Sequence, residues 1–187
     1  IDYLPGTNHI LYSADKGGNE INHIYLMSED GKISDLTPGK NEKASFAGWS
    51  KDKKSMYYIS NKRNPKFFDF YKMKIDTWKS EMLYQNDNGI NISDMSEDES
   101  WFSFSQTITT SENKLFLTNR IDKSTIELSV KPGSYSSSGF SKDNKYFFFI
   151  TDVGEEFSYL VKYEIKTGEQ EVLFQTNWDV MYSYLSE

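Results

Sequence analysis

One short turn sequence recurs along this chain at a nearly constant interval. Trp49-Ser50-Lys51-Asp52 returns as Met95-Ser96-Glu97-Asp98 and as Phe140-Ser141-Lys142-Asp143, and Leu185-Ser186-Glu187 begins it once more. The four serines lie 46, 45 and 45 residues apart. A fixed period of this size indicates that one supersecondary unit is repeated, each copy burying its apolar faces against its neighbours.

Each interval contains short runs of aromatic and β-branched residues, which favour strands. One run follows each turn, at residues 55–60, 101–105 and 146–151. A second run fills the same packing position four times, with Tyr25, Tyr71, Leu117 and Tyr163. A third set carries Leu36, Leu83, Leu128 and Leu173. The strand that leads into each turn is expected at 44–49, 91–95, 135–140 and 179–185.

The repeat predicts an all-β fold, a β-propeller segment of about four four-stranded antiparallel blades. No stretch shows sustained helical periodicity, which disfavours a solenoid of helix pairs. We expect one propeller domain or fragment over residues 1–187, with repeats at about 1–43, 44–89, 90–134 and 135–178 and the start of a further strand at 179–187. The first repeat is degenerate, because Leu4-Pro5-Gly6-Thr7-Asn8 replaces the turn sequence.

The ends of the sequence leave two alternatives. Either the chain is cut between blades, or residues 179–185 complete the first blade and close a four-bladed ring. We favour the cut, because a closed ring has no use for a partial turn motif, and we expect the chain to be a piece of a longer protein.

Composition excludes several classes of function. The chain has no cysteine, which excludes disulfides and thiolate metal sites. Its net charge is −7 with both signs mixed along the sequence, which disfavours nucleic acid as a partner. The longest apolar run, residues 146–150, is far too short for a membrane helix. We expect no cofactor and no membrane partner; bacterial cytoplasm and periplasm both fit, and we favour the cytoplasm.

The recurring turns resemble the Trp-Ser-Pro-Asp-Gly-Lys turn of TolB-like propeller repeats. In addition, the stretch from Ser60 to Tyr71 (SNKRNPKFFDFY) resembles the N-terminal propellers of prolyl oligopeptidase family serine peptidases, which include dipeptidyl and acylaminoacyl peptidases. The general repeat covers nearly the whole chain, and the peptidase-like part covers residues 16–84. The resemblance implies a propeller that covers the active site of an α/β-hydrolase domain and admits short peptides.

The sequence departs from this turn pattern at the position after Asp. Lys53, Glu99 and Asn144 stand where the family usually has Gly. Asn tolerates a positive φ, whereas Lys and Glu are strained there. We therefore expect a different turn geometry at Lys53 and Glu99.

The repeated Ser and Asp residues are expected to be structural, because a role repeated three times is that of a turn cap. The same holds for the aromatic residues before them, which we expect in the core between blades. The predicted set of structural turn residues is Trp49, Ser50, Asp52, Ser96, Asp98, Phe140, Ser141 and Asp143.

No residue pattern points to catalysis within this chain. The sequence lacks the Gly-x-Ser-x-Gly elbow of a serine hydrolase. The two histidines, His9 and His23, have no evident partner and are expected at the surface or in packing. Glu155-Glu156 resembles the glutamate pair that anchors a substrate amino terminus in dipeptidyl peptidases, but we expect these residues at a solvated hairpin tip.

The sequence therefore predicts a non-catalytic propeller that belongs to a prolyl oligopeptidase-like serine peptidase. Its expected partners are a C-terminal α/β-hydrolase domain beyond residue 187 and peptide substrates. The leading alternative is a TolB-like propeller that serves as a protein-interaction scaffold. A propeller lyase or glycosidase is a third, weaker alternative, because no cluster of His, Arg or carboxylates stands out.

Overall fold

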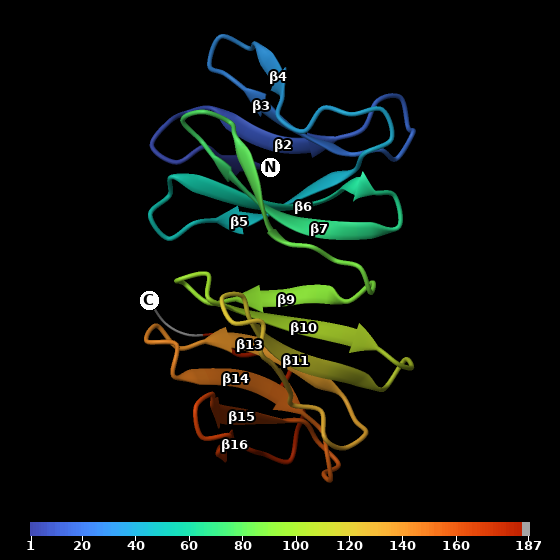
Figure 1. Cartoon of the computed structure of the whole chain (residues 1–187), viewed down its shortest axis with the longest axis vertical. Coiled ribbons are helices and arrows are strands. Elements are labelled where there is room, and N and C mark those ends of the chain that lie inside the picture. The colour runs from blue at the N-terminus through green and yellow to red at the C-terminus, as the bar shows by residue number, and fades with distance from the viewer. Residues whose placement is uncertain (185–187) are drawn as a thin grey trace. The chain divides into compact units, whose positions relative to one another are not determined.

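The computed structural model describes residues 1–184 and, at residue 91, the backbone only. The regular secondary structure of these residues consists of strands alone. The strands form four antiparallel sheets of four strands each (Figure 1). In every sheet the strands are hydrogen-bonded in chain order, so each sheet is a simple meander. We call the sheets blades 1 to 4.

The blades follow one another along the chain. Blade 1 comprises β1 (Asp2–Tyr3), β2 (Ile10–Ala14), β3 (His23–Met27) and β4 (Ile33–Asp35). Blade 2 comprises β5 (Ala44–Trp49), β6 (Ser55–Asn64), β7 (Phe67–Lys74) and β8 (Ser80–Tyr84). Blade 3 comprises β9 (Asn91–Met95), β10 (Trp101–Thr107), β11 (Asn113–Asn119) and β12 (Thr125–Glu127). Blade 4 comprises β13 (Tyr135–Phe140), β14 (Tyr146–Thr151), β15 (Tyr159–Glu164) and β16 (Gln170–Phe174).

Aromatic and aliphatic side chains explain why these segments form sheets that pack on both faces. In β6 the consecutive residues Met56, Tyr57 and Tyr58 are all buried, although they alternate between the two faces of the sheet. The predicted packing position on the third strand of each blade is also buried, and it is filled by Tyr25, Tyr71, Leu117 and Tyr163.

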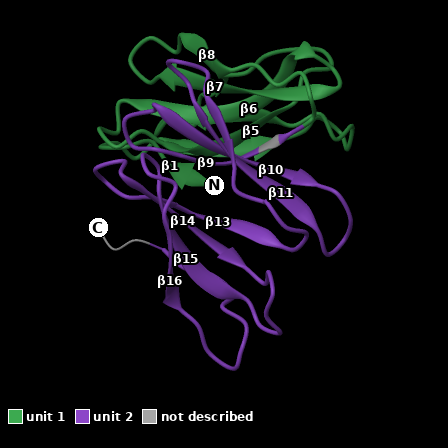
Figure 2. Ribbon diagram, turned by 60° about the horizontal axis from the view of Figure 1, so that its bottom comes forward, with its two compact units in different colours: residues 1–89 green, residues 90–187 purple. Residues whose placement is uncertain are grey.

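The chain divides into two compact units, residues 1–89 with blades 1 and 2 and residues 90–187 with blades 3 and 4 (Figure 2). Each unit has its own apolar core. In the first unit Leu11 and Ile24 of blade 1 pack with Met56, Tyr58 and Tyr71 of blade 2. In the second unit the core joins the two blades through Leu115, Leu117, Leu128, Tyr135, Phe140, Phe147, Phe149, Val161 and Tyr163.

Two segments differ from the sequence expectation. The further strand expected from residue 179 is not formed over residues 179–184, which lack strand pairing; instead the Val180 N–H donates to the Ser158 carbonyl oxygen at 3.0 Å. The remaining residues, 185–187, lie outside the described part. The other difference is β6, which continues to Asn64 and forms a long hairpin with β7.

The repeated four-stranded sheets confirm the predicted fold class, an all-β propeller of about four blades. Among the described residues, no helix is long and apolar enough to cross a membrane.

Candidate binding site

The three recurring turns join the first and second strands of blades 2, 3 and 4, and they have the same geometry. In blade 2 the Ser50 hydroxyl donates to Asp52 Oδ1 at 2.7 Å and accepts the Ser55 N–H at 2.9 Å. Ser96 and Ser141 make the same two bonds, to Asp98 and Trp101 and to Asp143 and Tyr146. The serine hydroxyls therefore form their hydrogen bonds inside their own turns and stabilise them.

Hydrogen bonds also hold the turn aspartates ionised. The bonds from the Ser50 hydroxyl and the Lys54 N–H lower the pKa of Asp52, and those from the Ser141 hydroxyl and the Lys145 N–H lower that of Asp143. Burial acts to raise the pKa of Asp98, but hydrogen bonds from Ser100 and Ser96 outweigh burial and lower it. These carboxylates are acceptors within the turns.

The expected difference in turn geometry at Lys53 and Glu99 is wrong. Their φ angles are 56° and 61°, close to the 55° of Asn144. In all three turns the N–H of this residue donates to the carbonyl oxygen of the turn serine at 2.9 Å. This is a type I turn followed by a left-handed residue, so Lys53 and Glu99 accept the strained conformation that glycine adopts freely.

The aromatic residues before the turns are buried to different degrees. Phe140 is 7% exposed and packs against Phe147 with ring centroids 4.8 Å apart. Trp49 is only half-buried, against the expectation for a core residue, because its indole N–H reaches the edge of blade 1 and donates to Asp2 Oδ2 at 3.1 Å.

The structure gives His23 a carboxylate partner. His23 is 6% exposed, and its Nδ1 lies 2.8 Å from Asp35 Oδ2, a partner that the sequence analysis did not identify. The other nitrogen, Nε2, has no hydrogen-bond partner among the described residues. The Glu155-Glu156 pair lies in the exposed turn between β14 and β15. No three His, Asp or Glu side chains in the described part of the chain gather in a way that could hold a metal ion.

An ion pair between buried Asp69 and partly exposed Arg63 anchors the long β6–β7 hairpin. Asp69 is fully buried and accepts two hydrogen bonds from the Arg63 guanidinium, at 2.7 and 2.8 Å, and one from the Asn86 N–H at 2.8 Å. Burial acts to raise the pKa of Asp69, but the bonds from Arg63 and Asn86 outweigh it and lower the pKa. Arg63 also donates to the Asn86 carbonyl oxygen, so the pair fixes the connection that leaves blade 2.

Asp94 of blade 3 occupies a position at which blades 2 and 4 have glycine. The first strands of blades 2, 3 and 4 each have a bulge, and the residue after it is Gly48, Asp94 or Gly139. Asp94 bonds to Ser137 of blade 4, and Ser137 lies 3.2 Å from the Ser103 hydroxyl. Burial raises the pKa of Asp94, so ionisation of this group costs free energy in the folded state.

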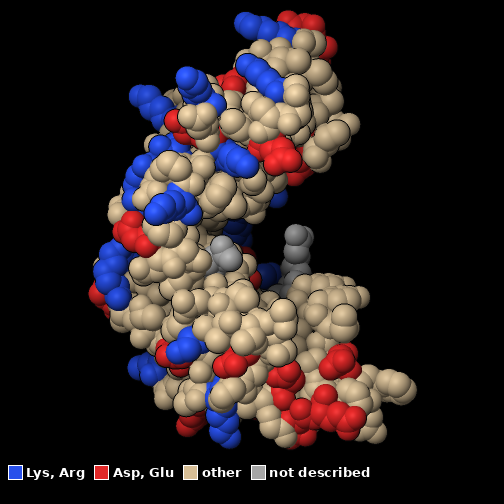
Figure 3. Space-filling view, turned by 90° about the vertical axis from the view of Figure 1, so that its right-hand side faces the viewer, with Lys and Arg blue, Asp and Glu red and all other residues tan. Residues whose placement is uncertain are grey.

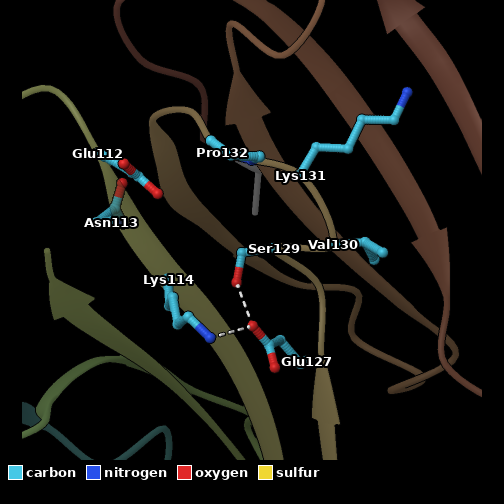
Figure 4. Close-up of a pocket in the computed structure, with 8 residues that line it drawn as sticks. All are labelled: Glu112, Asn113, Lys114, Glu127, Ser129, Val130, Lys131 and Pro132. Carbon is cyan, nitrogen blue, oxygen red and sulfur yellow. Dashed lines mark hydrogen bonds and ion pairs between the residues drawn. The ribbon is translucent and has the colours of Figure 1, made fainter.

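Two cavities meet at the connection between blades 3 and 4, residues 128–134. The first, which we call the outer pocket, has a volume of about 430 Å³ and lies beside β11 and β12 (Figure 4). Its wall is charged and already paired: Lys114 Nζ lies 2.9 Å from Glu127 Oε1, which also accepts the Ser129 hydroxyl. Figure 4 shows Lys131 extending away from this pair.

The second cavity, which we call the groove, has a volume of about 250 Å³ and lies on the face of blade 4 that packs against blade 3. Its floor is formed by the buried side chains of Tyr135, Phe149 and Val161. Its walls include two exposed valines, Val130 at 81% and Val172 at 52%. Polar groups of Lys131, Thr151, Tyr159 and Gln170 also line it, so the groove combines an apolar floor with a polar surround.

Contacts with the side chains of Asp152 and Val153 hold the connection in place. The Ser134 N–H donates to Asp152 Oδ1 at 2.8 Å. A Cβ atom on Gly133 would lie 2.7 Å from Val153 Cγ2 and 2.8 Å from Asp152 Oδ1, so any other residue here would have to displace these two side chains. The groove is therefore bounded by a segment whose position is set by the β14–β15 loop.

The second unit is also the more acidic one. Acidic residues outnumber basic residues two to one after residue 89, whereas the two kinds are nearly balanced before it. Figure 3 shows acidic side chains gathered at the lower end of the view, over blade 4. The surface of this unit as a whole therefore favours cations over anions.

Solved structures share this fold. TolB from Acinetobacter baumannii is 16% identical, with 94% of this chain and 45% of that chain covered and a TM-score of 0.60. A puromycin-hydrolysing peptidase from Mycobacterium tuberculosis is 14% identical over 89% of this chain and 27% of its own, with a TM-score of 0.56. Prolyl oligopeptidase B from Galerina marginata is 11% identical over 92% and 25%, with a TM-score of 0.58. The chain spans less than half the length of each.

No curated protein matches the sequence. The model of one protein family does match, that of the dipeptidyl peptidase IV (DPP IV) N-terminal region, over residues 4–117. The match covers more than half of the chain and includes the Arg63–Asp69 hairpin and the turns of blades 2 and 3. This TolB-like propeller chain therefore belongs to the family of dipeptidyl peptidase IV N-terminal regions.

Proposed function

We propose that this chain is the non-catalytic propeller part of a prolyl oligopeptidase-like serine peptidase, where it controls access of peptides to a hydrolase domain beyond residue 187. The observation that carries the proposal is the family match over residues 4–117. The internal bonding of the turn serines agrees with it, because Ser50, Ser96 and Ser141 all donate their hydroxyl hydrogens to turn aspartates.

A propeller can control access because its sheets are rigid. Each blade is fixed by a packed apolar core and by internally bonded turns, so the blade ends hold their positions while a substrate approaches. A long or folded polypeptide is then excluded by size, whereas a short peptide passes.

The test compares the full-length parent protein with a form that lacks residues 1–187. We expect the intact protein to cleave a dipeptidyl chromogenic substrate and to spare a 30-residue peptide with the same cleavage site. The shortened form should lose this size selection. Titration of the reactive serine with a fluorophosphonate gives the folded fraction of each form, so a loss of folding is not mistaken for a loss of selection. An unchanged ratio of long to short cleavage per titrated serine would refute the gating role.

The exposed apolar surface at the end of blade 4 favours a second candidate, a protein-interaction scaffold. Val172, Leu173 and Phe174 of β16 are 43–57% exposed, and Trp178 and Tyr182 that follow are about three-quarters exposed. Such a surface is typical of a contact with another protein segment. A full-length protein with no fluorophosphonate-reactive serine would favour this candidate over the peptidase.

A further inference from the structure

We propose that the outer end of blade 2 binds an acidic peptide segment. The site, which we call the lysine surface, comprises Lys54 in the β5–β6 turn and Lys74 and Lys79 at the two ends of the β7–β8 turn. The inference concerns this chain alone, so it holds whether or not a hydrolase domain follows.

Backbone hydrogen bonds bring the three lysines together. The Lys74 N–H donates to the Lys79 carbonyl oxygen at 3.0 Å, so these two residues lie opposite each other, and the Ile75 N–H donates to the Lys54 carbonyl oxygen at 3.0 Å. All three lysines are exposed, and none forms an ion pair with a carboxylate in the described part of the chain. Like charges opposite each other repel, so an anionic ligand relieves a repulsion that the free protein carries.

The other blades show that folding does not require lysines here. The same backbone bond closes the equivalent turns of blades 3 and 4 at 2.9 Å, but between Asn119 and Ser124 and between Glu164 and Glu169. Charges near an outer strand protect it from aggregation whatever their sign, and blade 4 has negative charges at these positions. The positive sign in blade 2 therefore points to the charge of what binds there.

A polar cavity lies between these residues. Its volume is about 400 Å³, and every side chain that lines it is charged or has a hydroxyl group: Lys72, Lys74, Asp76, Thr77, Lys79, Ser80 and Glu81. Ammonium and hydroxyl groups donate hydrogen bonds, which matches carboxylates that only accept them. The two acidic side chains in the lining favour a ligand with spaced carboxylates over a densely charged phosphate chain.

The β7–β8 turn is held in place before any ligand arrives. Trp78 has a φ of 54°, its N–H donates to the Lys74 carbonyl oxygen at 2.8 Å, and its side chain packs against the apolar core of the first unit. A bulky residue keeps this conformation only where its surroundings impose it. A site with a fixed backbone loses less conformational entropy when it binds.

The outer strand of the blade favours a peptide as the ligand. β8 has a strand neighbour on one side only, and Ser80, Glu81 and Met82 are all exposed. The free edge of such a strand pairs with the backbone of an extended peptide, and side-chain contacts then supply specificity. A nucleic acid lacks that backbone, so we infer a peptide with alternating acidic residues.

The experiment is a two-dimensional ¹H–¹⁵N NMR titration of the 187-residue chain with the peptide acetyl-Glu-Thr-Glu-Thr-Glu-amide. Peptides with Gln or Lys in place of every Glu serve as probes with the same backbone. We expect the amide signals of Ile75, Thr77 and Ser80 to shift, with the Glu peptide binding about tenfold more tightly than the Gln peptide, as several exposed charge pairs together supply. High salt should remove this preference.

Matched double variants assign the effect to the lysine surface. Lys74→Gln with Lys79→Gln should weaken binding of the Glu peptide about five- to tenfold. Lys40→Gln with Lys66→Gln, the matched control, removes the same charge from exposed lysines outside the cavity lining and should leave binding intact. Glu81→Gln removes an opposing charge and should strengthen binding.

Charge reversal tests the site itself. Lys74→Glu with Lys79→Glu installs the residue types that blade 4 has at these positions, so the fold should persist, as unshifted signals of blade 3 would show, and the preference should change to the Lys peptide. Equal binding of the Glu and Gln peptides, signal shifts confined to other residues, equal effects of the two Gln double variants, or tighter binding of an oligothymidylate than of the Glu peptide would each overturn the proposal.

Discussion

Replacing Lys53 by glycine should stabilise the protein, although most glycine substitutions destabilise. Lys53 has a φ of 56° in the turn between β5 and β6, and its side chain is exposed. The left-handed conformation costs a residue with a Cβ atom about 1–2 kcal/mol. Glycine avoids this cost but loses about 0.5–1 kcal/mol through its greater freedom in the unfolded chain. The net gain expected for Lys53→Gly is about 0.5–1 kcal/mol.

Blade 1 supplies an internal precedent for this substitution. Its turn between β3 and β4 has the sequence Ser28-Glu29-Asp30-Gly31, with the same Ser-to-Asp hydroxyl bond and with Gly31 at a φ of 81°. The Gly31 N–H donates to the Ser28 carbonyl oxygen just as the Lys53 N–H donates to that of Ser50. The same turn thus already forms in this protein with glycine at the strained position.

Urea unfolding of the purified chain measures the effect, with Lys54→Gly as the matched control. Lys54 is the next residue, carries the same charge, is also exposed and does not have a positive φ. Lys54→Gly should therefore destabilise by about 0.5–1 kcal/mol. For a chain of this size, a gain of 1 kcal/mol raises Tm by about 2–4 °C. If Lys53→Gly lowers the free energy of unfolding as much as Lys54→Gly does, the strain argument fails.

Three further changes test the packing and the buried charges by the same unfolding assay. Phe140→Ala should cost about 3–5 kcal/mol and Trp49→Ala less, because only Phe140 is buried; the reverse ranking would contradict this. Asp69→Asn should cost about 1.5–3 kcal/mol, because the Asn86 N–H and the Arg63 guanidinium lose a charged acceptor at a buried position while Arg63 keeps Asp87 as a partner; a cost near zero would refute that role. Asp94→Asn should stabilise the folded protein at pH 7, because burial raises the pKa of Asp94 and makes its ionised form costly. The gain should vanish below about pH 4, where the carboxyl group is protonated in both the folded and the unfolded state. A gain independent of pH would contradict this.

The sign of these pH effects follows from each pKa. Asp69 has a lowered pKa in the folded state, so its contribution to stability is present above the ordinary pKa of about 3.9 and is lost as the pH falls through the lowered value. Asp94 has a raised pKa, so the wild-type chain loses stability as the pH rises from the ordinary to the raised value.

The blades could be predicted from the sequence because each blade is formed by one continuous stretch of about 45 residues, and the turn motif marks each stretch. Ser50, Ser96 and Ser141 recur with the period of one sheet, and the aromatic runs between them have strong strand propensity. The strain at Lys53 could not be predicted, because propensity disfavours a left-handed lysine and the two flanking hydrogen bonds that impose it depend on strand register.

The sites depend on packing that no motif encodes. Arg63 and Asp69 face each other only because the hairpin turns at Pro65, which sets the register of β6 and β7. The Asp35 partner of His23 comes from the pairing of β3 with β4. The groove is lined by Leu128 and Val130, which follow β12, and by Val161 and Val172 of β15 and β16, so it depends on how two different blades pack.

Fluorophosphonate labelling of the full-length protein, followed by peptide mapping, tests the proposed function most directly. A serine peptidase nucleophile reacts with this reagent, whereas a hydroxyl bonded within a turn does not. The account predicts one labelled serine beyond residue 187, cleavage of short peptides that is lost on labelling, and an unlabelled, inactive isolated chain. Labelling of Ser50, Ser96 or Ser141, or a full-length protein that neither reacts nor cleaves peptides, would contradict it.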